Sequence, residues 1–266
     1  MQQLTGFRDI RKTLFPFKFI GLILLRLFTA DLHIHTCLSP CTELDMSPTK
    51  ILTAAINKGL DILAICDHNS TANSSAVMKA AKTLDIHIIP GMEVTSEEEV
   101  HVLALFDDIT NALELQKHVY DNLPGKNDPE AFGMQVIVNE KEEVLGFEEK
   151  LLIGATTIPL EEIIRQIHIL EGIAIASHID REAFSILGQL GFIPEDIGLE
   201  ALEISPRISF EEAFGLYKTP YPLCTFSDAH YPDDIGKSFT SLLLEDGTVA
   251  EMKKAFRNEE GRKLIY

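Results

Sequence analysis

The feature that most limits how this chain folds is a series of eight short apolar runs, separated by polar turns and helical patterns. Most of the runs are apolar at every position, which is typical of parallel strands buried on both faces. Strands that alternate with helices predict a parallel α/β fold, either an open sheet or a closed barrel. The eight predicted strands are Leu27–Ile34, Ile62–Cys66, His87–Pro90, His101–Phe106, Ile173–Ser177, Ala201–Ile204, Leu223–Phe226 and Ser238–Leu244.

Five helices are expected between or after these runs. Ser47 suits an N-cap and Pro48 suits the first helical position, so a helix should cover Thr49–Lys58 and end before Gly59. The other four are predicted over Ser74–Thr83, Leu160–Leu170, Glu211–Tyr217 and Val249–Arg257.

Two segments depart from this alternation. Residues 121–154 contain turn residues and two apolar stretches, Met134–Val138 and Glu143–Phe147, which predict an insertion that holds a β-hairpin. Residues 1–24 are interpreted as an N-terminal extension to the main domain, residues 25–266. The apolar stretch near its end is interrupted by Lys18 and Arg26 and is shorter than the roughly 20 residues of a membrane span. We therefore expect neither a membrane anchor nor secretion.

The charge balance bears on possible partners. The chain has 23 Lys and Arg against 41 Asp and Glu, a formal net charge of −18. Long nucleic acids bind mainly to Lys and Arg, so this surface should repel them. A small phosphorylated substrate or a short strand end stays compatible, because metal ions create a local positive field. The four cysteines show no secretory pattern, so reduced thiols and a cytoplasmic location are expected.

Residues that bind metals gather where the predicted strands end. His33 and His35 alternate along the first strand and point to one side of it. The C-terminal ends of parallel strands meet at one face, where active sites form. His101 opens its strand, so it reaches that face only if the boundary differs or the strand runs in an unusual direction. The other candidate ligands are His68, Glu93, His178, Asp228 and His230.

Each motif is weak alone, because a pair of alternating histidines is often an ordinary feature of a strand. Six of the nine histidines at such positions, together with carboxylates, favour a metal cluster. Imidazole and carboxylate ligands suit zinc, manganese or iron. One ion cannot use so many ligands, so two or three divalent ions with shared bridging groups are expected.

The ordered motifs DLHIHTCLSPC, ICDHNS, PGMEVTS, IASHIDR and TFSDAH resemble those of the PHP (polymerase and histidinol phosphatase) family. The resemblance extends from about Ala30 to Phe239. It implies a distorted TIM-like barrel of seven β/α units with the metal cluster at the C-terminal face of the strands. Amidohydrolases also open with two alternating histidines, but the final Asp228 and His230 favour the PHP family.

The resemblance also implies three groups of ligands. It assigns His33, His35, Glu93 and Asp228 to a first ion, lets Glu93 bridge to a second ion with His101 and His178, and assigns His68 and His230 to a third. Many relatives complete the third group with an Asp or His shortly after the first two histidines. Here Cys41 is the candidate, and Cys37 is interpreted as a packing residue. Asp31 and Asp67 are expected to support ligands without binding an ion.

The implied activity is that of a metal-dependent phosphoesterase, with phosphoric monoester hydrolysis as the first expectation. We expect in-line attack on phosphorus by a hydroxide that bridges the ions, with Glu93, His178 and His230 as catalytic residues. Arg181 and Arg207 are candidates for binding the substrate phosphate, and surface positions explain both arginines equally well.

The substrate is expected to be a small phosphorylated metabolite or nucleotide. Some relatives that look like this chain act on nucleoside 3′,5′-bisphosphates and short RNA 5′ ends. A phosphatase of the histidinol-phosphate type, a non-catalytic PHP metal-binding module and a metal hydrolase of non-phosphate bonds remain as alternatives.

Overall fold

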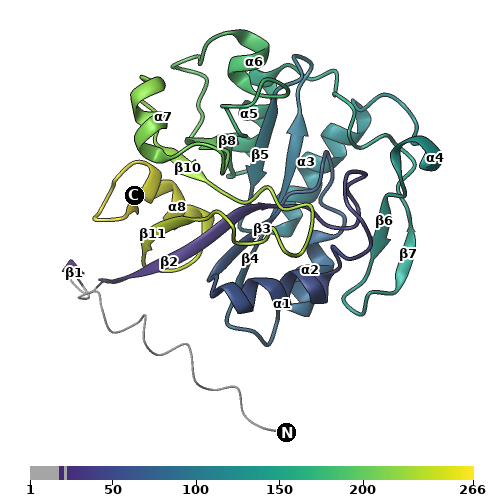
Figure 1. Cartoon of the computed structure of the whole chain (residues 1–266), viewed down its shortest axis with the longest axis horizontal. Helices are drawn as coiled ribbons and strands as arrows, with labels where there is room; N and C mark the ends of the chain where they lie inside the picture. Colours follow the sequence, from purple (N-terminus) through teal and green to yellow (C-terminus); the bar gives the residue numbers. More distant parts are fainter. Residues whose placement is uncertain (1–17, 21–22) are drawn as a thin grey trace, which may run out of the picture.

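The computed structural model describes residues 18–20 and 23–266, and a strongly curled sheet lies at its centre (Figure 1). Seven strands follow one another around this sheet in the order β2-β3-β4-β5-β8-β9-β10. An isolated bridge between Ile34 and Ala229 links the end of β2 to the segment after β10. The predicted α/β fold, a distorted TIM-like barrel, is therefore confirmed. The seven strands are β2 (Ile23–Ile34), β3 (Ile62–Ile65), β4 (His87–Thr95), β5 (His101–Leu105), β8 (Ile173–Ala176), β9 (Ala201–Ile204) and β10 (Leu223–Thr225).

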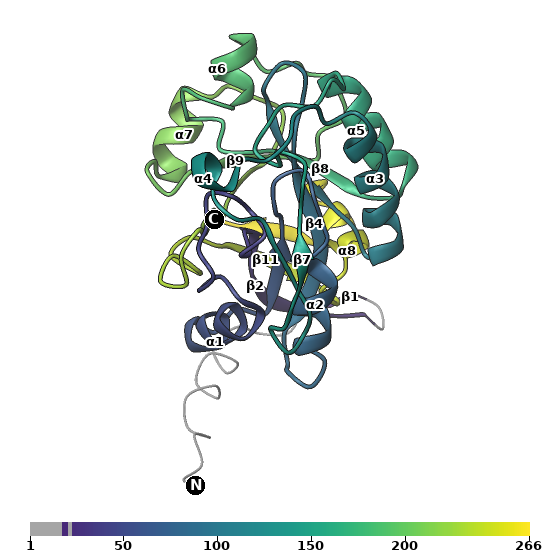
Figure 2. The same ribbon diagram turned by 90° about the vertical axis from the view of Figure 1, so that its right-hand side faces the viewer.

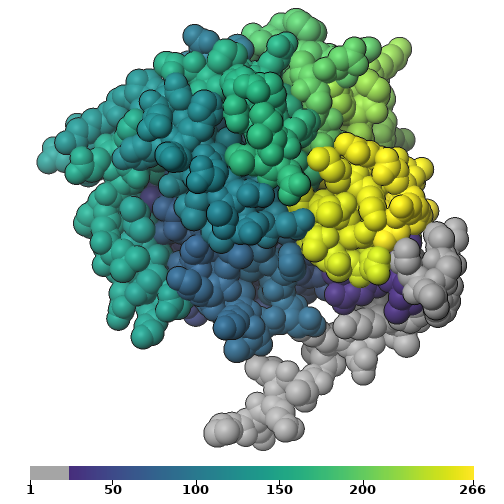
Figure 3. Space-filling view, turned by 180° about the vertical axis from the view of Figure 1, so that it is seen from behind, coloured from purple at the N-terminus to yellow at the C-terminus, as the bar shows by residue number. Residues whose placement is uncertain are grey.

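The C-terminal segment extends the sheet beyond β2. β11 (Thr240–Leu244) pairs antiparallel with β2, and β12 (Lys263–Ile265) pairs with β11. At its other end, β2 pairs with the short strand β1 (Lys18–Ile20). Figure 3 shows this C-terminal segment, in yellow, beside β2 on the far side of the molecule.

Apolar side chains pack in an inner and an outer layer. The inner cluster takes residues from all seven barrel strands, from β11 and from α8 (Val249–Phe256). Outside, α1 (Pro48–Lys58) and α2 (Ser74–Ala80) cover the first part of the sheet. A second group of helices covers the rest, and Figure 2 shows two of its members, α3 and α5, side by side. This group consists of α3 (Ile109–Asp121), α5 (Leu160–Ile169), α6 (Ile186–Leu190) and α7 (Phe210–Leu216).

All five predicted helices are present, and the first has Ser47 at its N-cap and Pro48 at its first position as expected. The sequence did not predict α3. Its buried residues, Ala112, Leu115 and Val119, recur at helical spacing and form one apolar face, as in the helices that were predicted.

The prediction that the barrel strands are parallel is wrong for β5, which runs antiparallel to both β4 and β8. The reason is the connection before it. Ser96 donates its backbone N–H to Val100 at 2.9 Å, so β4 and β5 are joined by a tight turn, and a parallel pair would require a much longer crossover. Because β5 is reversed, its first residue, His101, lies at the same face as the C-terminal ends of the other strands.

A bulge in β2 decides which way its two histidines point. The register between β2 and β3 shifts between Asp31 and Ile34, where β2 contains one residue more than its partner. Leu32 consequently packs in the inner cluster, whereas Ile34 packs under the outer helices. In a regular strand these two side chains would share a face, and the neighbouring histidines would point outward. The bulge brings His33 and His35 to the inside.

The predicted hairpin is also present. β6 (Val136–Val138) and β7 (Val144–Phe147) pair antiparallel after the short helix α4 (Pro129–Phe132). The hairpin lies at the edge of the molecule in Figure 1 and packs on it through a small apolar cluster. Cys37 belongs to this cluster, and burial raises the pKa of its thiol to about 12.

The division of the chain into an extension, a main domain and an insertion over residues 121–154 stays a prediction. Most of the expected extension, residues 1–17 and 21–22, lies outside the described residues. Within residues 18–20 and 23–266, the helices are too short or too polar to cross a membrane.

A stability test follows from the close approach of β4 and β5. A Cβ added at Gly91 would lie 2.7 Å from the carbonyl oxygen of Ala104 and 2.8 Å from Leu105 Cδ2. Gly91→Ala should therefore lower the free energy of unfolding by about 1–3 kcal/mol through overpacking, as measured by urea denaturation. Gly146→Ala is the matched control, because a Cβ there meets nothing within 4 Å. Equal stability of the two variants would contradict the close packing of β4 on β5 at Gly91.

Candidate metal centre

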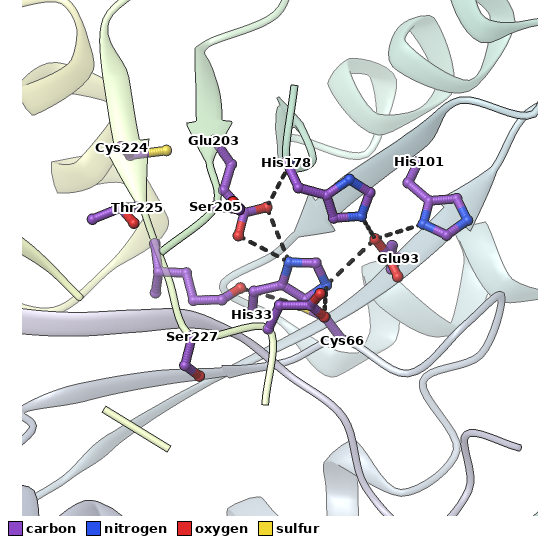
Figure 4. A network of polar contacts seen from close by, with 12 residues as sticks. His33, Cys66, Glu93, His101, His178, Glu203, Ser205, Cys224, Thr225 and Ser227 are labelled. Atoms are coloured by element: carbon purple, nitrogen blue, oxygen red, sulfur yellow. Dashed lines mark hydrogen bonds and ion pairs between the residues drawn. The ribbon is translucent and has the colours of Figure 1, made fainter. Parts of the chain in front are cut away.

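The eight His, Asp and Glu candidate ligands meet at one face of the barrel. They come from the C-terminal ends of β2, β3, β4 and β8, from the start of β5 and from the segment after β10. Figure 4 shows His33, His101 and His178 turned toward Glu93. All eight except His230 have side chains that are almost fully buried.

Glu93 occupies the centre of the cluster. Its carboxylate oxygens lie 2.9 Å from His101 Nδ1 and 3.0 Å from His68 Nδ1. They also lie 3.3 Å from His178 Nε2, 3.4 Å from His33 Nε2 and 3.6 Å from His35 Nε2. Burial would raise the pKa of the Glu93 carboxyl, but His101 and His33 hold it well below its usual range. A single carboxylate thus joins five candidate ligands from four segments of the chain.

Asp228, in the segment after β10, also approaches His33 and His35. Its Oδ1 lies 3.3 Å from His33 Nε2 and 3.2 Å from His35 Nε2. The backbone fixes this approach, because Ala229 accepts a hydrogen bond from the His35 N–H at 3.0 Å and donates one to the His33 carbonyl at 3.2 Å. Asp228 has φ 48°, in the left-handed region, which aspartate adopts more readily than most residues.

Cys41 lies beside the imidazoles of a different part of the cluster. Its sulfur and single ring nitrogens of His35, His68 and His230 all lie within 4.8 Å of one another. Burial would raise the pKa of the Cys41 thiol, but hydrogen bonds with His230 and His68 lower it to about 7. Its sulfur is thus next to the same two histidines with which the sequence grouped it.

Asp31 and Asp67 hold the backbone segments that carry ligands. Asp31 accepts backbone hydrogen bonds from Ser227 at 3.0 Å and Gly236 at 2.9 Å, and so ties down both ends of the segment that carries Asp228 and His230. Burial raises the pKa of Asp31 to about 6.

Asp67 acts on the first strand. It accepts hydrogen bonds from the Thr36 N–H and the Ser39 hydroxyl, both at 2.7 Å. The Ser39 hydroxyl in turn lies 3.0 Å from His35 Nδ1. Asp67 therefore reaches His35 through Ser39.

Glu203 is part of the site, and the sequence analysis missed it. This fully buried carboxylate on β9 lies 3.0 Å from His33 Nδ1 and accepts the backbone N–H of His178 at 3.2 Å (Figure 4). A carboxylate behind a metal-binding histidine fixes its ring orientation and tautomer. The available signal was an isolated charge inside the apolar run Ala201–Ile204, where a buried glutamate needs a partner.

The residues fit divalent cations. His33 Nε2 is buried and makes no hydrogen bond, although two carboxylate oxygens lie 3.3 and 3.4 Å from it. His101 Nε2 and His178 Nδ1 are also buried without hydrogen-bond partners. A buried imidazole nitrogen that faces carboxylates without a hydrogen bond, as His33 Nε2 does, suits a metal site, since an ion supplies the missing partner. Beyond the group around Cys41, two further groups have metal-binding spacing, and both contain Glu93.

A cleft of about 600 Å³ opens above this cluster. Arg181 and Arg207 both line it, so the structure brings the two predicted phosphate-binding residues to the candidate ligands. Arg181 Nη2 lies 2.6 Å from Asp228 Oδ2, while its buried Nε has no hydrogen-bond partner. Phe184 also lines the cleft and stacks on His101 with ring centroids 4.7 Å apart.

Substitution of Glu203 tests its support of His33. Glu203→Leu should weaken metal binding by about 10–100-fold, as loss of such a carboxylate commonly does. Glu203→Gln should lose less, because its amide oxygen still accepts from Nδ1. Affinity is measured by competition with a chromophoric chelator. Glu200→Gln alters a buried carboxylate outside the cluster and should bind metal like the wild type. Wild-type affinity in folded Glu203→Leu protein would refute the supporting role.

Comparison with known proteins identifies the family. Residues 31–189 match the PHP domain. A 5′-3′ exoribonuclease of Haemophilus influenzae is 33% identical over 84 residues, 30% of each chain. An uncharacterized protein of Methanocaldococcus jannaschii is 31% identical over 99 residues, 34% of this chain and 58% of that one. The matched segments therefore span less than two thirds of either relative.

Two solved structures share the fold. The lesion-specific endonuclease Q of Pyrococcus furiosus superposes with a TM-score of 0.66 at 18% identity, over 90% of this chain and 58% of that chain. A two-domain protein of Bacteroides vulgatus, which contains a predicted PHP-like metal-dependent phosphoesterase, gives 0.53 at 15% identity, over 91% and 65% of the two chains. At these identities the likeness concerns the fold alone. Because the family match covers more than half of the sequence, this protein belongs to the PHP domain family.

Proposed function

We propose that this protein is a metal-dependent phosphoesterase that hydrolyses small phosphate monoesters. The observation that carries the proposal is the position of Arg181 and Arg207 in a cleft directly above a buried cluster of imidazoles and carboxylates. Such a site suits a phosphate group, since cations and guanidinium groups neutralise the charge that otherwise repels a nucleophile.

The proposed ions number two or three and are zinc, manganese or iron. The contacts of Glu93 and Asp228 with His33 and His35 support a first ion position. The contacts of Glu93 with His101 and His178 support a second. The spacing of Cys41, His68 and His230 supports a third.

Bound ions would supply positive charge and lower the pKa of water to near neutrality. Glu93 keeps the ligands of separate strands together, and Arg181 keeps Asp228 in place through its Nη2 contact. The remaining N–H groups of Arg181, together with Arg207, are free to bind phosphate oxygens. His178 and His230, the other proposed catalytic residues, line the cleft and would act there by holding ions that offset the charge on the leaving oxygen.

The size and charge of the protein favour a small substrate. A cleft of about 600 Å³ accommodates a nucleotide or phosphorylated metabolite, and the net charge of −18 disfavours a long polyanion. Histidinol phosphate fits the same description. A non-catalytic PHP module is disfavoured, because the chain has a metal-binding residue at each position where the family resemblance implies a ligand.

Hydrolysis at short nucleic-acid ends is the second candidate. It is favoured by the 33% identity with the exoribonuclease, although that match covers only 30% of each chain. Endonuclease Q, which has the same fold, has been solved in complex with a 27-mer duplex that carries an abasic lesion at the active site. The fold is therefore compatible with binding of a nucleic acid. Release of mononucleotides from 5′-phosphorylated RNA of two to five nucleotides, but not of inorganic phosphate from monoesters, would favour this candidate.

A phosphatase screen tests the proposal. Chelator-treated protein should be inactive, and added Mn²⁺ or Zn²⁺ should restore phosphate release from at least one member of a broad monoester panel. His33→Ala should abolish turnover, because it removes a proposed metal ligand that lies between the carboxylates of Glu93 and Asp228. Its circular dichroism spectrum should stay that of the wild type. His87→Ala, an exposed histidine outside the cluster, is the control and should stay active. Fully metallated wild type that releases no phosphate from the whole panel would refute a monoesterase.

A further inference from the structure

We propose that the position formed by Cys41, His68 and His230 selects a soft divalent ion, zinc in preference to manganese, while the positions around Glu93 accept harder ions. The centre would then contain two kinds of metal. This inference rests on the proposed metal-dependent function, which it deepens by assigning a different ion preference to one position.

The donor atoms differ between the positions. The group of Cys41 with His35, His68 and His230 offers three imidazole nitrogens and one sulfur, and no oxygen. The other two groups with metal-binding spacing both include the Glu93 carboxylate. Thiolate and imidazole ligands select zinc, whereas manganese prefers carboxylate oxygen and water. The chemistry of the side chains alone therefore separates one position from the others.

Two members of the group with Cys41, His35 and His68, also belong to the groups with Glu93. His68 faces Glu93 through its Nδ1 at 3.0 Å, so its Nε2 remains for the position with Cys41. His35 also belongs to the group with His33 and Glu93, and its Nε2 lies 3.2 Å from Asp228 Oδ1. With His35 engaged there, Cys41, His68 and His230 remain, and all three line the cleft. Three protein ligands and a position open to the cleft are the pattern of a catalytic zinc site, whereas structural zinc sites are closed by four.

The three ligands are held in place by hydrogen bonds outside the group. The hydroxyl of Thr42, next to Cys41, donates to the Thr36 carbonyl at 2.6 Å and lies 2.8 Å from the Ser39 carbonyl. His230 Nδ1 lies 2.8 Å from the Asp228 carbonyl, which requires a proton on Nδ1 and leaves Nε2 free to coordinate. His68 is fixed by a parallel bridge to Glu93. These contacts hold the sulfur and the two imidazoles in an arrangement that suits a metal ion.

The second cysteine of the same loop provides a matched control. Cys37 lies four residues before Cys41, but it packs in the apolar cluster under the hairpin, where its thiol faces Val136 and Asn73. Cys37→Ser thus removes a thiol from the same loop without touching the proposed position. Cys41→Asp replaces the sulfur by a carboxylate oxygen, a donor that manganese prefers.

The experiment uses full-length protein, stripped of metal and then equilibrated with equal concentrations of Zn²⁺ and Mn²⁺. Metal content per chain is measured by mass spectrometry after gel filtration. Wild type and Cys37→Ser should retain about one zinc that excess Mn²⁺ does not displace. Cys41→Asp should lose that zinc and gain manganese in its place. Reconstitution with Co²⁺ gives a second readout, a thiolate-to-cobalt charge-transfer band present in wild type and Cys37→Ser and absent in Cys41→Asp.

The outcomes separate this inference from the proposed function. The inference would be overturned if Cys41→Asp contained the same amounts of zinc and of manganese as wild type. It would also be overturned if the wild-type cobalt protein lacked the charge-transfer band. Both results count whatever the phosphatase screen shows. Selective zinc binding that depends on Cys41, in a protein inactive on every phosphoester, would uphold the inference and leave the proposed function refuted. A circular dichroism spectrum and a thermal melt of each variant exclude loss of folding as the cause.

Discussion

The arrangement of the site depends on one buried carboxylate. Glu93 lies within 3.6 Å of ring nitrogens of five histidines, which belong to β2, β5 and the segments after β3 and β8. A charged group with so little access to water is stable only when its partners compensate its lost hydration. The strand ends must consequently stay close together, and the barrel provides the rigid frame that keeps them so. A divalent ion placed among these atoms would meet a preformed set of donors.

Two irregularities of the sheet make this convergence possible. The bulge in β2 turns His33 and His35 toward the interior, and the reversal of β5 brings His101 to the face where the other candidate ligands lie. Both depart from an ideal parallel barrel of regular strands. Bulges commonly re-aim side chains next to active sites, and here the change of face is required for two of the candidate ligands. The fold is therefore distorted at the places where the chemistry needs it.

Behind the candidate ligands, a layer of buried polar residues fixes their orientation. Glu203 faces His33, Asp67 reaches His35 through Ser39, and Asp31 holds the segment of Asp228. Asp31 and Asp67 were predictable as supports, because each stands within two residues of a ligand motif. Glu203 was not, since it comes from a distant strand and belongs to no motif. Its contact exists only because the sheet curls until β10 alone separates β9 from β2.

The sequence by itself determined the α/β class, the five helices, the hairpin and the identity of the eight His, Asp and Glu candidates, because apolar periodicity and ligand spacing are local properties. The tertiary structure alone decided the direction of β5, the face to which the β2 histidines turn and the partnership of Glu203 with His33. The approach of Cys41 to His68 and His230, which are 27 and 189 residues away, was expected only from the family resemblance and is a product of the tertiary structure. These features depend on strand register and long-range packing, which the residues of one segment do not encode.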